Sequence, residues 1–234
     1  MAELLQTNNL SKVYGKGEKR ALSDVSVTIP RGRIVGLLGP NGSGKTTFIK
    51  LINGLLQPSG GNILIDGNAP GKESKAIVSY LPDKFCLSPD QTIDELITYY
   101  ADFYNDFDRQ RAAEMLSSLQ IDEKRRIKTL SKGTKEKLQL IMVMSRRAKL
   151  YVLDEPIAGV DPAARDYIIR TIINNYDKEA SVLISTHLIS DVEPILDDVI
   201  FIKEGRILLY SDAEDLRERQ GKSLDAYFRE VFAC

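Results

Sequence analysis

A glycine-rich stretch between an apolar run and a helix-forming run restricts the fold of this chain most. It fits the pattern G-x-x-x-x-G-K-[ST] of a phosphate-binding loop. The run at 34–38 is typical of a buried strand, and the run at 48–52 has helix-forming content. Glycines let successive N–H groups point at one anion, and a helix N-terminus adds partial positive charge. Eight fitting positions in this context disfavour a chance glycine turn. The stretch comprises Gly39, Pro40, Asn41, Gly42, Ser43, Gly44, Lys45, Thr46 and Thr47.

A second motif is an apolar run at 150–153 that ends in Asp154 and Glu155. Acids at the end of such a strand lie at the carboxyl edge of a sheet, where α/β proteins bind ligands. We expect Asp154 to hold Mg²⁺ and Glu155 to orient or deprotonate an attacking water. In the loop, Lys45 can reach the β- and γ-phosphates, and Thr46 can offer its hydroxyl to Mg²⁺. The alternative is a surface strand that merely ends in acids, and the phosphate loop makes it the weaker reading.

Bulk composition indicates a globular protein with a substantial core. The chain has 234 residues, of which 43% are hydrophobic and 28% charged. Its net charge of −1 excludes a global field for nucleic acid. Cys86 and Cys234 lack a metal-ligand pattern, and no secretory signal is evident, so we expect a reducing cytosol. No apolar run approaches the roughly 20 residues of a membrane span. We therefore expect any membrane role to depend on another chain.

Periodicity along the chain predicts strands that alternate with helices. Strands are expected around 4–10, 25–29, 34–38, 62–67, 76–81, 150–153, 181–185 and 199–202, with a loop at 15–20. Helices are expected from about 90 to 104, 108 to 119, 135 to 147 and 163 to 174. This alternation implies a mainly parallel sheet covered on both faces, with a helical insertion in the middle of the chain.

Further short motifs occur in a fixed order around these two. Tyr14 precedes the first loop, Leu130 to Thr134 lie in the helical insertion, Ala158 to Asp161 follow Glu155, and Ser185-Thr186-His187 end a strand. Together with the phosphate loop and the acids, this set resembles the ATP-binding cassette (ABC) ATPases, the motor subunits of ABC transporters. The resemblance spans essentially the whole chain.

The resemblance implies an α/β fold of the P-loop NTPase type. It would have a mainly parallel core sheet, an antiparallel β-subdomain and an α-helical subdomain. The core and β-subdomain would cover 1–84 and 148–234, and the helical subdomain 85–147 would carry the signature motif, all in one ABC ATPase domain over 1–234.

The resemblance also assigns roles. Tyr14 would stack on adenine, and His187 would contact the γ-phosphate and the attacking water. Ser131 and the N-terminus of its helix would stabilise the γ-phosphate of ATP held by a second subunit, and Gly133 and Asp161 would also belong to the ATP-binding residues. Taken singly, Tyr14 could instead cover a strand edge, His187 could be structural, and Ser131 and Asp161 could be ordinary helix caps.

Two positions depart from the family pattern. Lys132 stands where the signature normally has glycine, and Thr134 replaces its glutamine. Asp83, after Tyr80-Leu81-Pro82, stands where the family usually has a glutamine that contacts Mg²⁺. Asp83 could ligate Mg²⁺ but would lie near Asp154 and Glu155, so we expect slower or more Mg²⁺-dependent hydrolysis than with glutamine. Both departures resemble a bacterial branch that powers drug, antibiotic-resistance and peptide exporters.

We therefore expect an ATP-hydrolysing motor subunit that pairs around two Mg-ATP and drives separate permease subunits, on the cytoplasmic face of the membrane. The partners would be ATP, a second ABC ATPase subunit and the permease, with no nucleic acid. The alternatives are a weakly hydrolysing or regulatory subunit of a heterodimer, or a soluble ABC ATPase outside transport. The intact Lys45, Asp154, Glu155 and His187 argue against complete loss of hydrolysis.

Three surface features are open to more than one interpretation. The basic residues at 124–128 and 146–149 are typical of solvated faces. Residues 85–87 could line a groove for a permease helix or pack internally. Apolar residues between 224 and 232 fall on one helical face, which we expect to dock on the body of the protein.

Overall fold

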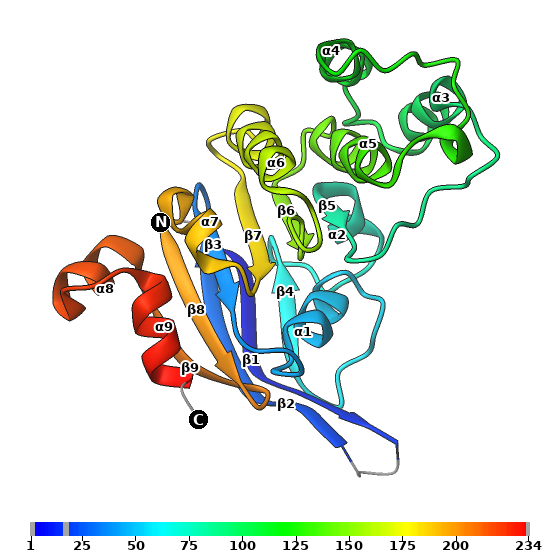
Figure 1. Cartoon of the computed structure of the whole chain (residues 1–234). Helices are drawn as coiled ribbons and strands as arrows, with labels where there is room; N and C mark the ends of the chain where they lie inside the picture. The colour runs from blue at the N-terminus through cyan, green and yellow to red at the C-terminus, as the bar shows by residue number, and fades with distance from the viewer. Residues whose placement is uncertain (1–2, 16–18, 233–234) are drawn as a thin grey trace.

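The computed structural model describes residues 3–15 and 19–232, and it contains two sheets (Figure 1). Part of the loop expected at 15–20, and Cys234, lie outside the described residues. The larger sheet has six strands in the order β5-β6-β7-β3-β8-β9. All pairs in it are parallel except β8 with β9. Its strands are β3 (Ile34–Leu38), β5 (Val78–Leu81), β6 (Leu150–Asp154), β7 (Ser181–Thr186), β8 (Asp198–Lys203) and β9 (Arg206–Asp212).

The smaller sheet is antiparallel and has three strands in the order β2-β1-β4. Its bounds are β1 (Glu3–Tyr14), β2 (Lys19–Pro30) and β4 (Gly60–Ile65). Period-two alternation at 4–10 and 25–29 predicts the first two strands, because one face of this sheet is buried and the other is exposed. The mainly parallel core sheet and the antiparallel subdomain are thereby confirmed.

Helices cover both faces of the core sheet and extend from one edge of it. In Figure 1, α3, α4 and α5 form the green part of the molecule, beyond the β5–β6 edge. The helices are α1 (Lys45–Ile52), α2 (Lys72–Ile77), α3 (Ile93–Phe103), α4 (Arg109–Ser118), α5 (Lys132–Met144), α6 (Pro162–Asn175), α7 (Ile189–Val192), α8 (Ala213–Gln220) and α9 (Leu224–Phe232). Two 3-10 turns are η1 (Ile127–Thr129) and η2 (Glu193–Ile195).

Alternate side chains of the central strands enter two different cores. In β6, Leu150 and Val152 pack with the antiparallel sheet and α1, whereas Tyr151 and Leu153 pack with α5 and α6. Both faces are therefore buried, which explains why these strands are continuous apolar runs in the sequence. The loops that follow the carboxyl ends of these strands are therefore attached to the buried centre of the protein.

Several predicted boundaries are wrong, and the helix α2 is missed. Ala76 and Ile77 end α2 rather than begin a strand, because Ser74 bonds the Gly71 backbone and starts a helix there. The helix expected from 135 begins at Lys132, since the Ser131 hydroxyl accepts the Thr134 N–H at 3.2 Å and caps it. The strand β9 and the helix α8 are also absent from the sequence prediction.

Arg146 is another correction, because it is buried rather than part of a solvated basic face. Its guanidinium pairs with Asp106, donates to the carbonyls of Ala76 and Val78, and lies 3.8 Å from the centroid of the Tyr104 ring. Arg146 therefore links the helical region to the edge of the core sheet.

The other two open features are also resolved by packing. Leu87 packs in the core, but Phe85 is 39% exposed, so only part of that segment is internal. The apolar face of α9 docks on the protein, where Tyr227, Phe228 and Phe232 all contact the ring of Phe201. Over residues 3–15 and 19–232, no helix is long and apolar enough to cross a membrane.

Candidate functional site

The site forms where three neighbouring strands end. The strands β6, β7 and β3 are adjacent and parallel, so the loops after them meet at one edge of the sheet. In the register, Leu38 pairs with Thr186, and Asp154 pairs with Ser185. The phosphate loop is more than a hundred residues from the two acids and the histidine in the sequence, and Glu155 and His187 are 32 residues apart. Strand order brings them together.

The phosphate loop packs against β2 and against the turn between β8 and β9. Gly44 has φ +113°, and a Cβ on it would lie 2.8 Å from the carbonyl oxygen of Ala21, so only glycine fits there. Gly205, in the turn between β8 and β9, donates its N–H to the Ser43 carbonyl at 2.8 Å and accepts from the Ser23 N–H at 2.8 Å. This turn links the loop to the antiparallel sheet.

The Lys45 ammonium lies inside the loop. Its Nζ donates to the carbonyl of Gly39 at 2.7 Å and to that of Pro40 at 3.3 Å, and it lies 3.6 Å from Glu155 Oε1. Burial lowers the pKa of Lys45, and the charges of Glu155 and Asp154 oppose that shift. Because the two carbonyls are neutral, the ammonium is suited to exchange its bonds to them for stronger bonds to charged phosphate oxygens.

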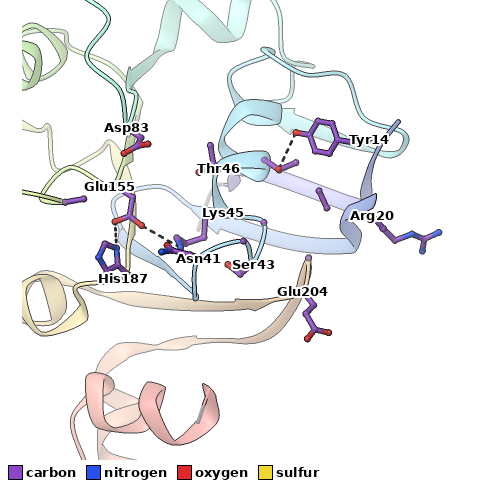
Figure 2. Close-up of a pocket in the computed structure, with 16 residues that line it drawn as sticks. Tyr14, Arg20, Asn41, Ser43, Lys45, Thr46, Asp83, Glu155, His187 and Glu204 are labelled. Carbon is purple, nitrogen blue, oxygen red and sulfur yellow. Dashed lines mark hydrogen bonds and ion pairs between the residues drawn. The ribbon is translucent and has the colours of Figure 1, made fainter. Parts of the chain in front are cut away.

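Glu155 lies between Lys45 and His187, as Figure 2 shows, and its Oε2 is 2.9 Å from His187 Nδ1. Its backbone has φ +51°, in the left-handed region that few non-glycine residues adopt. Ser185 holds it there, because the Glu155 N–H donates to the carbonyl of Ser185 at 3.0 Å and to its hydroxyl at 3.1 Å. Ser185 therefore fixes the backbone of Glu155, and His187 contacts its carboxylate.

Asp154 is buried at the end of β6, and burial raises the pKa of its carboxyl. The Ser185 hydroxyl donates to its Oδ1 at 2.6 Å, and this hydrogen bond opposes the shift. The nearby charges of Asp83 and Glu155 reinforce the shift. Its Oδ2 is buried without a hydrogen-bond partner, so one oxygen remains for a ligand. Within 3–15 and 19–232, no three His, Cys, Asp or Glu side chains gather into a metal cluster.

Lys45, Glu155 and His187 line a cavity of about 540 Å³. Tyr14 is at the far end from Glu155, where its hydroxyl is 3.4 Å from the Thr47 hydroxyl (Figure 2). The Tyr14 side chain is 37% exposed, so its ring is accessible. The lining residues are Tyr14, Arg20, Ala21, Asn41, Gly42, Ser43, Gly44, Lys45, Thr46, Thr47, Asp83, Glu155, Ala158, His187, Glu204 and Gly205.

Some of the predicted site residues lie elsewhere. Gly39 is buried at the start of the loop. Asp154 lines a neighbouring cavity of about 420 Å³, which Asp83 and Lys132 also line. Ser131, Gly133 and Asp161 line neither cavity. Lys132 is 82% exposed and pairs with Glu136 at 3.8 Å, so the signature helix accommodates it without crowding.

Sequence reasoning missed the supporting residues. Ser185 was visible only as part of the motif that ends in His187, and its bonds to two acids require the β6–β7 register. Gly205 and Ala21 carry no motif at all, although Glu204-Gly205 is a turn signal. Their contacts with the loop depend on how the two sheets pack.

Comparison with known proteins identifies the family. A family model described as "ABC transporter" matches residues 22–158, from β2 to the loop after Glu155. The chain belongs to the ABC transporter family, as an ATP-binding subunit. The linearmycin resistance ATP-binding protein LnrL of Bacillus subtilis is 31% identical to it, over 93% of this chain and 72% of that protein. The SkfA peptide export ATP-binding protein SkfE of the same organism is 35% identical, over 88% of each chain. The lantibiotic transport ATP-binding protein SrtF of Streptococcus pyogenes is 31% identical, over 92% of this chain and 95% of that protein.

Solved structures agree with this assignment. An ATP-binding subunit of an ABC transporter is 29% identical, covers 97% of this chain and 99% of its own, and superimposes with a TM-score of 0.88. A dimeric cassette in a post-hydrolysis state, bound to ADP and phosphate, shares the fold at 23% identity and a TM-score of 0.77, over 89% of this chain and 98% of that one. This ABC subunit is therefore an ATPase whose hydrolysis of ATP is coupled to transport.

Proposed function

We propose that this ABC subunit works in pairs that close around two Mg-ATP and drive separate permease subunits of an exporter. The observation that carries the proposal is the position of Glu155, whose backbone is held by Ser185 and whose carboxylate lies between Lys45 and His187. Export is supported by the names of relatives in linearmycin resistance, peptide export and lantibiotic transport. Residues 85–147 would move as the helical subdomain, and the pair would dock on the cytoplasmic face of the membrane through its permease.

The chemistry would be positioning and charge stabilisation. The phosphates would lie along the loop N–H groups, and the Lys45 ammonium would leave the two carbonyls that hold it to bind the β- and γ-phosphates. Glu155 would accept a proton from the attacking water, and His187 would hold the Glu155 carboxylate and contact the γ-phosphate. Tyr14 would stack on the adenine at the other end of the cavity.

The residues present fit a Mg²⁺ ion. The unpartnered buried Oδ2 of Asp154 and the exposed hydroxyl of Thr46 are oxygen donors of the kind that Mg²⁺ prefers, and Asp83 is a third candidate. When bound, the ion would neutralise charge that develops on the phosphate oxygens. Asp154 would be held ready for it by the hydrogen bond from Ser185.

The cavity would be half of a complete site. Ser131, Gly133 and Asp161 lie away from the cavity of their own chain, which supports a role toward ATP bound to a second subunit. Ser131 is exposed at the N-terminus of α5, where its hydroxyl and the helix dipole favour a γ-phosphate. A dimeric cassette of the same fold is consistent with this arrangement.

A phosphate-release assay on the purified chain tests the motor role. We expect Mg²⁺-dependent release from ATP that rises more steeply than linearly with protein concentration, because two subunits complete each site. Omission of Mg²⁺ is the control. No release at any concentration, with ATP still bound, would favour the second candidate, a regulatory subunit of a heterodimer, which Asp83 and Lys132 suggest.

Asp83 should make hydrolysis depend more strongly on Mg²⁺. Its charge adds to those of Asp154 and Glu155, and without a bound Mg²⁺ these carboxylates would repel the phosphates of ATP. We expect Asp83→Gln to hydrolyse ATP several-fold faster than the native chain at limiting Mg²⁺, with a smaller difference at saturation. Asp83→Asn is the matched control, because it removes the charge without lengthening the side chain. Identical Mg²⁺ curves for the native chain and Asp83→Gln would refute this prediction.

A further inference from the structure

Gln139 is a buried polar side chain that lies outside the motifs of the site. It is on α5 and only 4% exposed. Its Nε2 donates to the carbonyl of Pro82 at 3.4 Å, and its Oε1 accepts the N–H of Cys86 at 3.3 Å. One planar amide thus bonds both ends of the segment 82–86. An amide offers a donor and an acceptor together, whereas a carboxylate only accepts and a methionine side chain forms neither bond.

The segment 82–86 carries Asp83 into the site. Asp83 lies between the two bonded residues and lines the same cavity as Lys45 and Glu155. Gln139 and Phe85 line the neighbouring cavity of about 420 Å³, together with Asp83. That space gives the segment room to shift if the two hydrogen bonds are lost, and a shift would move the Asp83 carboxylate relative to Asp154 and Glu155.

The same helix carries the signature motif. Ser131 caps α5, and Gln139 follows eight residues later, about 12 Å along the axis at 1.5 Å per residue. The helix between them is continuous from Lys132 to Met144. A displacement of α5 would therefore act on Ser131 and on the segment 82–86 together.

We propose that Gln139 is a positioning residue that holds Asp83 on the nucleotide cavity and ties its place to α5, the helix that presents Ser131. The bond between Gln139 and the segment stands on the geometry alone. Its consequence for hydrolysis rests on the proposed function of the site.

Alkylation of Cys86 tests the bond without nucleotide. The chain has two cysteines, so Cys234→Ser leaves Cys86, which is exposed, as the only target. In this background, Gln139→Met keeps the volume and removes both hydrogen bonds. We expect the Cys86 thiol to react about fivefold faster or more, and its amide hydrogen to exchange faster by a similar factor. Gln139→Glu, which sets a carboxylate oxygen against the Pro82 carbonyl, should act in the same direction.

The matched control is Ile141→Val, which trims a buried side chain of the same helix. It should leave the Cys86 rate within about twofold of the background, since it removes no hydrogen bond. Far-ultraviolet circular dichroism confirms that each variant is folded. An unchanged Cys86 rate in folded Gln139→Met, or an equal rise in Ile141→Val, would overturn the proposal.

A double-mutant cycle tests whether Gln139 acts through Asp83. Gln139→Met should change ATP turnover and its Mg²⁺ half-saturation several-fold in the native background, and by less than about twofold in Asp83→Ala. Equal effects in both backgrounds would overturn the link to Asp83. If the chain released no phosphate, the proposed function would fail, but the alkylation result would still test the bond to the segment.

Discussion

Glu155→Gln is expected to lower ATP hydrolysis by about 10²-fold or more while ATP still binds. Glutamine keeps the size of the side chain and the contact with His187, but it cannot accept a proton from water. It also removes a negative charge 3.6 Å from Lys45 Nζ, which strengthens the hold of the lysine on phosphate. The variant should therefore accumulate as an ATP-bound dimer. Phosphate release measures the first effect, and sedimentation with and without ATP measures the second.

The control for this prediction is Glu114→Gln, which neutralises an exposed glutamate of α4 that lines neither cavity. It should hydrolyse ATP like the native chain. Native turnover in Glu155→Gln would remove Glu155 from the chemistry. A variant that remains a monomer in saturating ATP would count against the paired site.

Lys45→Met is expected to lower the rate of hydrolysis by about 10²-fold or more and also to weaken ATP binding. The methionine fills the volume of a side chain that is 6% exposed, but it supplies no charge to the phosphates and leaves Glu155 and Asp154 without their cation. Loss of one such stabilising group costs about 10²- to 10³-fold in turnover. ATP affinity should fall by about tenfold or more. Equilibrium dialysis with labelled ATP measures the affinity.

Lys50→Met is the matched control, since Lys50 is an exposed lysine in the last turn of the same helix α1. It should bind and hydrolyse ATP normally. The two site variants also separate ATP binding from hydrolysis, because Glu155→Gln should retain ATP whereas Lys45→Met should bind it more weakly. Undiminished ATP affinity in Lys45→Met would contradict the role given to the buried ammonium.

Local sequence patterns predicted most elements because their causes are local. Leu150 to Leu153 read as a buried strand, since alternate residues enter two cores. The patterns failed where a distant contact overrides them. Arg146 looks like one of several surface cations, but Asp106 and two backbone carbonyls bury it. Ala76 and Ile77 have strand-forming neighbours and still end α2.

The roles of Glu155, Lys45 and His187 remain proposals, but the type of chemistry was evident from the sequence. A glycine loop before a helix can be recognised anywhere, because the phosphate-binding conformation is set by a few consecutive residues. The same is true of two acids after an apolar strand. Neither pattern gives the distance between the glycine loop and the two acids in the folded protein.

By itself, therefore, the sequence determined the family, the nucleotide and the candidate groups. Only the tertiary structure decided which groups meet. The order β6-β7-β3 sets Glu155 between Lys45 and His187, and the β6–β7 register gives Ser185 its bonds to both acids. Packing of α5 brings Gln139 to the segment of Asp83 and leaves Ser131 outside the cavity. These contacts join residues far apart in the chain, so they depend on strand pairing and packing, which no local periodicity records.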